Sequence, residues 1–149
     1  MPNIITNKLV VSAKTEAEIE SFLSAIIGVD RDEILVIDFE RIVPMPQCGS
    51  IDWYDWRLSN WGTKWNAYDT DIDCYCDGSV ELYFYTANHG AIPVIKKLVE
   101  VFPNLEFIYK YADEDLSYNC GEAYGVDGNF SFKCAEDGSD EAMALYIEC

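Results

Sequence analysis

Hydrophobic and polar residues alternate over several short stretches of the chain, and this period of two predicts β-strands. The run LEFIYKY is the clearest example, and Pro44 and Pro46 follow another run at the point where a strand would end. Four strands of a main sheet are predicted in this way, at residues 3–12, 33–43, 80–86 and 105–111. Asp77-Gly78 separates residues 72–76 from the third of these strands, which predicts a hairpin.

Two segments repeat their apolar residues at helical spacing instead. The first helix begins after Thr15, a residue type that caps helices, and Gly28 is its predicted end. Its apolar face consists of Ile19, Phe22, Leu23, Ile26 and Ile27. The second helix is predicted at residues 91–102, with Pro93 in its first turn, where proline is tolerated. Each helix therefore has one face that must pack against another element.

The order of these six elements is β-α-β-β-α-β, which predicts an α+β fold of the ferredoxin-like type. In this fold an antiparallel sheet carries both helices on one face. Residues 47–79, which hold all four tryptophans and a short helix at about 52–59, form a predicted insertion between strands 2 and 3. A C-terminal hairpin is predicted from residues 117–123 and 128–134, and a last short helix follows Ser139.

Charge narrows the range of functions. We expect one domain over residues 1–149, with 27 acidic against 10 basic side chains and a net charge of −17. Direct binding to nucleic acid or to an anionic membrane surface is disfavoured, because both need clustered lysine and arginine. A basic protein partner fits the sign of the charge. Residues 101–149 hold 11 acidic and 2 basic residues, so we expect an acidic face to include them.

The sequence lacks the motifs of common catalytic sites, with no G-x-S-x-G, P-loop or H-E-x-x-H. His89 is the only histidine, and we expect it at a helix cap or on the surface. Asp69, Asp71 and Asp73 suggest calcium, but Cys74 stands where the EF-hand loop needs glycine. Because residues 1–11 lack the features of a secretory signal, we expect a cytoplasmic protein with reduced cysteines. We therefore predict no enzyme activity, no cofactor and no metal.

Two runs, WGTKWNA at residues 61–67 and YADED at residues 111–115, resemble the YubB-type ferredoxin-like family of phage and plasmid proteins, as does IPVI at residues 92–95. The resemblance spans roughly residues 1–125. It implies a ferredoxin-like fold in a mobile-element protein, without an iron–sulfur cluster, and it supplies no activity. The chain departs from the family pattern at residues 88–91, NHGA, which precede the second predicted helix.

Two groups of residues are candidates for binding a partner. Aromatic rings beside arginine and lysine can stack on a base or anchor a protein interface, and the insertion supplies Trp56, Arg57, Trp61, Lys64 and Trp65. The acidic candidates are Asp113, Glu114, Asp115, Glu122, Glu136, Asp137, Asp140 and Glu141. Each group also has a purely structural interpretation. The aromatic group would be a satellite core packed over the sheet, and the acidic group would be part of solvated loops.

Two functions are compatible with these patterns. The first is a non-enzymatic acidic interaction protein that occupies the basic surface of a host nucleic-acid-binding or defence protein. A row of carboxylates can imitate the closely spaced charges of DNA, as an anti-CRISPR or other anti-defence protein would require. The alternative is a small-molecule or nucleotide-binding module that uses the tryptophan-rich insertion. The oligomeric state is not predicted by any of these features.

Overall fold

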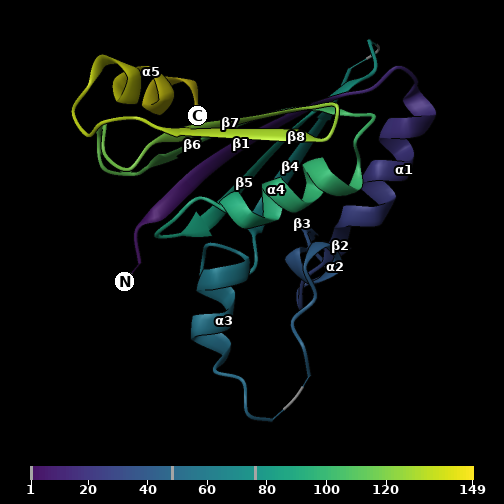
Figure 1. The fold of residues 1–149 in the computed structure, drawn as a ribbon, viewed down its shortest axis with the longest axis horizontal. Helices are drawn as coiled ribbons and strands as arrows, with labels where there is room; N and C mark the ends of the chain where they lie inside the picture. The colour runs from purple at the N-terminus through teal and green to yellow at the C-terminus, as the bar shows by residue number, and fades with distance from the viewer. Residues whose placement is uncertain (1, 48, 76) are drawn as a thin grey trace.

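The computed structural model describes residues 2–47, 49–75 and 77–149, and at its centre lies an antiparallel sheet of six strands (Figure 1). The strands lie in the order β4-β5-β1-β6-β7-β8. Their bounds are β1 Ile4–Ser12, β4 Tyr68–Cys74, β5 Ser79–Ala87, β6 Glu106–Asp113, β7 Gly121–Val126 and β8 Asn129–Cys134. The first strand of the chain therefore lies inside the sheet, hydrogen-bonded to β5 on one side and to β6 on the other.

Two helices, α1 (Glu16–Ile26) and α4 (Ile92–Val101), lie on the same side of this sheet, as Figure 1 shows. The ring of Phe22 in α1 packs edge-on against Phe102 at the end of α4 and against Phe107 in β6, with centroids 5.0 and 5.8 Å apart. The apolar residues of β1 that face the helices are fully buried: Ile5, Leu9 and Val11. The core thus fills the space between α1, α4 and one face of the sheet.

The start of α1 is the predicted one, and its end is not. The hydroxyl oxygen of Thr15 accepts the N–H of Glu18 (3.3 Å), which caps the helix. The helix ends at Ile26, and Gly28 lies beyond it in strand β2 (Ile27–Val29). A Cβ atom at Gly28 would lie 2.9 Å from a carboxylate oxygen of Asp38. Gly28 is therefore needed for close packing rather than to end the helix.

The prediction of a second main-sheet strand at residues 33–43 is wrong. The strand here is short, β3 (Leu35–Ile37), and it pairs with β2 in a separate two-stranded sheet. Asp38 then starts helix α2 (Phe39–Ile42), because its carboxylate accepts the N–H of Glu40 (3.1 Å). The second strand of the path β1-α1-β4-β5-α4-β6 is β4. The tryptophan-rich segment consequently lies between α1 and β4.

The C-terminal hairpin and helix are formed by β7, β8 and α5 (Asp140–Glu148). Asp127 and Gly128 both have positive φ in the turn, as a tight hairpin requires. Figure 1 shows α5 on the side of the sheet opposite α1 and α4. Its contacts are made with a small second core formed by Ala112, Cys120, Ala142 and Leu145. Helix α5 therefore covers the second face of the sheet near β6 and leaves that face open near β5 and β4.

A buried hydrogen-bond network joins β1 to the start of α4. The Asn7 side-chain N–H donates to two backbone carbonyls and to the Thr86 hydroxyl (3.0 Å). The Tyr109 hydroxyl donates to the Asn7 side-chain oxygen and accepts the Ala91 N–H (2.9 Å). All four residues are fully buried. Burial raises the pKa of Tyr109 well above its ordinary value, because a tyrosinate there would lose its hydration.

This network predicts a loss of stability at alkaline pH. In the unfolded chain a tyrosine releases its proton near pH 10, about its ordinary pKa. The raised pKa of Tyr109 means that the folded protein keeps that proton. The unfolded state then binds fewer protons, so the free energy of unfolding should fall as the pH rises above about 10. Thermal melts over a pH series, with tyrosinate absorbance recorded in parallel, measure this slope.

Tyr109→Phe should flatten the alkaline slope and also lower the stability at neutral pH, because Asn7 and Ala91 lose their partner. Tyr118→Phe, at an exposed position, is the matched control and should change neither quantity. An unchanged slope in Tyr109→Phe would show that Tyr109 is not responsible for the alkaline transition.

Candidate functional site

The tryptophan-rich segment is partly core and partly surface. Helix α3 (Trp53–Asn60) begins at Asp52, whose carboxylate accepts the Tyr54 N–H (3.0 Å). The side chain of Trp61, just after α3, is only 1% exposed, and its indole N–H donates to the Val43 carbonyl (2.9 Å). Its ring packs against those of Phe39 and Trp56, each with centroids 5.7 Å away. Two of the predicted binding residues, Trp56 and Trp61, therefore anchor the segment to the core.

The basic residues of this segment stack on its rings. The Arg57 guanidinium lies between Trp53 and Trp61, 5.0 Å from each centroid, and donates to the Lys64 carbonyl (3.2 Å). The Lys64 ammonium lies 4.6 Å from the centroid of Trp65, which is 41% exposed. The five predicted residues thus separate into an inner group and an outer pair, Lys64 and Trp65.

The WGTKWNA run holds the segment to three other elements. Gly62 has a positive φ, and a Cβ there would lie 2.8 Å from the Pro93 ring of α4. The buried Thr63 hydroxyl donates to the carbonyl of Ala87 at the end of β5 (2.8 Å). The Asn66 side-chain oxygen accepts the N–H of Phe39 in α2 (2.9 Å). The most distinctive run of the sequence therefore has a structural role at these positions.

Asp113, the first predicted acidic residue, is not on the surface. Its side chain is 2% exposed and accepts N–H groups from Asn3 (2.9 Å), Asn119 (3.2 Å) and the backbone of Asp115 (3.1 Å). It ties the N-terminal residues to the loop between β6 and β7. The prediction that Asp113 belongs to an exposed acidic face is therefore wrong, because hydrogen-bond donors from three residues surround its carboxylate.

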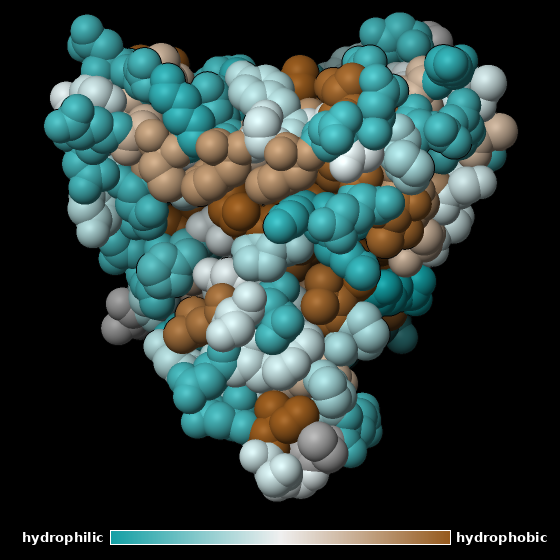
Figure 2. All heavy atoms as spheres, viewed as in Figure 1, coloured by the Kyte–Doolittle hydropathy of each residue, from teal (hydrophilic) through white to brown (hydrophobic). Residues whose placement is uncertain are grey.

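Five other predicted acids lie on two loops that meet and on the first turn of α5. The Asn119 N–H donates to the Asp137 carboxylate (3.0 Å), and the Gly138 N–H donates to the Ser117 carbonyl (2.8 Å). These bonds hold the β6–β7 loop against the β8–α5 loop. We call the exposed carboxylates on them and on the first turn of α5 the acidic end: Glu114, Asp115, Glu136, Asp137 and Asp140. Figure 2 shows hydrophilic atoms in this part of the molecule, over α5.

The remaining two predicted acids lie close to lysines. Glu122 lies on β7 in register with Lys110 of β6 and Lys133 of β8. Glu141 forms an ion pair with Lys133 (3.2 Å), and both side chains are exposed. Glu148, outside the predicted set, pairs with Lys110 (2.8 Å), and this hydrogen bond raises the pKa of Lys110. In the part of the chain that the structure describes, the carboxylates of the acidic end form no ion pair.

The open part of the second sheet face contains a groove that the sequence reasoning missed. We call it the tyrosine groove, and it has a volume of about 520 Å³. Side chains from β1, β4 and β5 line it together with Ile34: Thr6, Asp69, Asp71, Tyr83 and Tyr85. Cys149, after α5, is also among its lining residues. The sequence does contain a signal for this groove, because Tyr83 and Tyr85 are two residues apart and therefore share a face of their strand.

Carboxylates surround the phenols at this groove. The Tyr83 hydroxyl donates to Glu81 (2.8 Å), and this bond, with burial and the negative charge of Glu81, raises the pKa of Tyr83 to about 12. Partial burial and the charges of Asp69 and Glu114 raise the pKa of Tyr68. The rings of Tyr68 and Tyr85 lie 5.8 Å apart. The groove thus combines aromatic rings with a negative local field.

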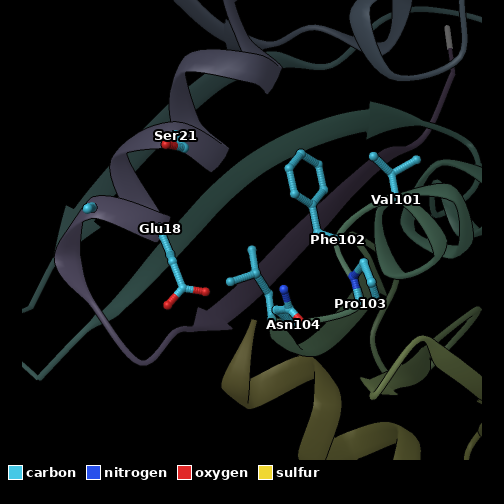
Figure 3. A pocket seen from close by; sticks show the side chains of 8 residues that line it. Glu18, Ser21, Val101, Phe102, Pro103 and Asn104 are labelled. Atoms are coloured by element: carbon cyan, nitrogen blue, oxygen red, sulfur yellow. The ribbon is translucent and has the colours of Figure 1, made fainter.

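A second hollow, of about 310 Å³, lies between α1 and the turn after α4 (Figure 3). Val101, Phe102 and Pro103 are among its lining residues, and the Glu18 carboxylate points into it in Figure 3. Glu18 already accepts the Thr15 hydroxyl (3.2 Å) as part of the helix cap. The hollow therefore has the chemistry of a shallow apolar surface with one carboxylate among its lining residues.

The cysteines do not form a metal site in the described ranges. Cys74, Cys120, Cys134 and Cys149 are not bonded to one another, and Cys48 and Cys76 lie outside the described residues. Within the described residues, no three histidine, cysteine or acidic side chains are grouped closely enough to hold a metal ion. None of the helices described has the length and apolar character needed to cross a bilayer.

Comparison with known proteins identifies the family. The sequence model of the family described as "Ferredoxin-like domain in Api92-like protein" matches residues 61–147, beginning at the WGTKWNA run. The crystal structure of protein api92 from Yersinia pseudotuberculosis has the same fold, with a TM-score of 0.57 and 15% sequence identity. The alignment covers 69% of this chain and 41% of that one, so this chain spans less than half of api92. No curated protein sequence matches the chain. Because the family match takes in more than half of the residues, the protein belongs to the Api92-like ferredoxin-like domain family.

Proposed function

We propose that this protein is a non-enzymatic interaction protein that binds the basic surface of another protein through its acidic end. The observation that carries the proposal is the pairing of the two loops by the Asn119–Asp137 and Gly138–Ser117 bonds, which joins two loops that carry exposed carboxylates. The net charge of −17 supports it, since opposite fields accelerate the encounter of two proteins. In this proposal the carboxylates of the acidic end take the place of the phosphate charges of DNA.

The partner in this proposal is a nucleic-acid-binding or defence protein of the host cell, met in the cytoplasm. The resemblance of the WGTKWNA run to the YubB-type family of phage and plasmid proteins supports an origin in a mobile element. A protein of such an element gains from blocking a nuclease or a defence complex. Duplex DNA should then compete with this protein for the same surface of its partner.

A pull-down from lysate of the host cell at moderate salt tests the proposal. We expect a stoichiometric basic partner that is released by raised salt and by added duplex DNA. Retention of no basic protein, or of a partner that DNA does not displace, would contradict it.

Removing charge from the acidic end should weaken that binding. The double variant Glu136→Gln/Asp140→Asn removes two exposed carboxylates of the acidic end. Because an exposed ion pair contributes about 0.2–1 kcal/mol, the affinity should fall about 2- to 30-fold. The control Glu20→Gln/Glu100→Gln removes the same charge from exposed positions on α1 and α4. Equal losses in both variants would mean that only the net charge matters and that the acidic end is not the contact surface.

The outer pair of the tryptophan-rich segment is the basis of a second candidate function, the binding of a small molecule or nucleotide. The favouring observation is the exposed ring of Trp65 beside the Lys64 ammonium, a combination that can stack on a base and attract a phosphate. Titration of a nucleotide and metabolite panel should then quench tryptophan fluorescence in the wild type and not in Trp65→Phe. Equal quenching in the two proteins, or none in either, would reject this second function.

A further inference from the structure

The tyrosine groove lies on the half of the second sheet face that α5 leaves open. Tyr83 and Tyr85 of β5 line it, and Tyr85 is 37% exposed. The strand register places Asp71 beside Tyr83 and Thr6 beside Tyr85, so all four side chains are on this face. The groove is therefore an aromatic surface with a carboxylate at its edge.

A backbone irregularity brings a second carboxylate to the same edge. The pairing of β4 with β5 shifts in register between Tyr68 and Asp71, and Asp69 adopts a positive φ of 50°. Thr70 turns inward instead, where its hydroxyl oxygen accepts the Ile37 N–H (3.1 Å). Bulges of this kind redirect side chains at the edges of sheets. As a result, Asp69 and Asp71 both line the groove and both are exposed.

The ring faces of the groove attract cations. The Lys8 ammonium already lies 5.9 Å from the centroid of the Tyr83 ring. Asp69 and Asp71 line the groove, and Glu81, which is hydrogen-bonded to Tyr83, is a third carboxylate beside it. Lys8 balances only one of these three negative charges, so the surroundings of the groove have a net negative charge. The ring of Tyr85 is paired with that of Tyr68, and among the described residues no lysine or arginine lies over it.

We propose that the tyrosine groove receives an arginine side chain from the basic partner, with the guanidinium stacked on Tyr85 and hydrogen-bonded to Asp69 or Asp71. Arginine fits because its flat guanidinium stacks on aromatic rings and presents paired N–H donors to a carboxylate. A volume of about 520 Å³ is ample for one such side chain. This inference rests on the proposed function and names the residue of the partner that the sheet face would recognise.

A capped peptide of alternating arginine and glycine residues is the probe, and the same peptide with citrulline in place of arginine is its control. Citrulline keeps the shape of the side chain and removes the charge. Binding is measured by chemical shift changes in the folded protein at constant ionic strength. We expect the arginine peptide to bind, with shifts at Tyr85 and Asp71, and the citrulline peptide not to bind.

Variants locate the contact. Tyr85→Leu and Asp71→Asn should each weaken the arginine peptide about 2- to 30-fold, the range that cation–π and charge-assisted contacts span. Tyr85→Phe keeps the ring and should retain binding. Tyr124→Leu, an exposed tyrosine on β7 of the same sheet face, should leave the affinity unchanged.

The two proposals can fail separately in this experiment. If Tyr85→Leu binds the peptide like the wild type while Glu136→Gln/Asp140→Asn binds it more weakly, the groove is overturned and the acidic end stands. If the groove variants weaken the peptide but the acidic-end variants leave binding of the cellular partner unchanged, the proposed function is overturned instead. Equal binding of the arginine and citrulline peptides, or binding of neither, would overturn the groove.

Discussion

Replacing Trp61 with alanine should destabilise the protein by about 3–5 kcal/mol, the usual cost of truncating a fully buried tryptophan. The indole is 1% exposed and contacts Phe39, Trp56 and the Arg57 guanidinium. Its removal also leaves the Val43 carbonyl without the indole N–H. The segment between α1 and β4 would lose its main attachment to the core. Chemical denaturation followed by circular dichroism measures the change in the free energy of unfolding.

The matched control is Trp65→Ala, four residues away on the exposed side of the same run. It should cost less than about 1 kcal/mol, since surface substitutions have small effects. A small cost for Trp61→Ala together with loss of partner binding would reverse our interpretation of Trp61 as an anchor. Similar large costs in both variants would mean that the outer face of the segment is also packed.

The second large effect is expected from Asp113→Asn, which should cost about 1.5–3 kcal/mol, the range for hydrogen bonds to a charged group. The carboxylate accepts from the side chains of Asn3 and Asn119 and from a backbone N–H. An asparagine retains one acceptor oxygen, and its own N–H₂ group would face an amide donor. The loss should appear as a lower midpoint of denaturation with an unchanged slope.

Glu114→Gln provides the comparison for Asp113, because the adjacent carboxylate is exposed and its replacement removes the same charge. Its stability should stay within about 0.5 kcal/mol of the wild type, the usual range for surface sites. If the Asp113→Asn protein were as stable as the wild type but bound the basic partner weakly, Asp113 would be a binding residue rather than a structural one.

Much of the main sheet followed from the sequence alone. Alternation located β1, β5 and β6, and apolar residues at helical spacing located α1 and α4, because each of these elements buries one face. Asp77-Gly78 predicted the β4–β5 hairpin for a stereochemical reason, since tight turns need residues that tolerate positive φ, as Gly78 has. These predictions rest on local chemistry, which a single sequence contains.

The failures came from contacts between distant residues. Residues 33–43 have the composition of a strand, yet the Asp38 cap turns the chain into α2 within this segment. In the sequence Asp113 belongs to an acidic run that is typical of an exposed loop. In the fold the side chains of Asn3 and Asn119 donate hydrogen bonds to its carboxylate, and their positions cannot be inferred from the local sequence. The tyrosine groove needs β4, β5 and the end of α5 together, and no local pattern states which strands are neighbours. The site was therefore harder to predict than the elements that form it.

The central position of β1 has a consequence for how quickly the chain folds. Ile4 is paired with Ala87 of β5, and Ile5 is paired with Asp113 of β6. Both partner strands of β1 are therefore far from it in the sequence and are synthesised much later. Chains dominated by such distant contacts close large loops before they gain stabilising interactions, and they fold in milliseconds to seconds rather than microseconds. During synthesis one edge of β1 has no partner until β5 has been made, and the other has none until β6 has been made. Chaperone dependence during translation should accordingly centre on the first dozen residues.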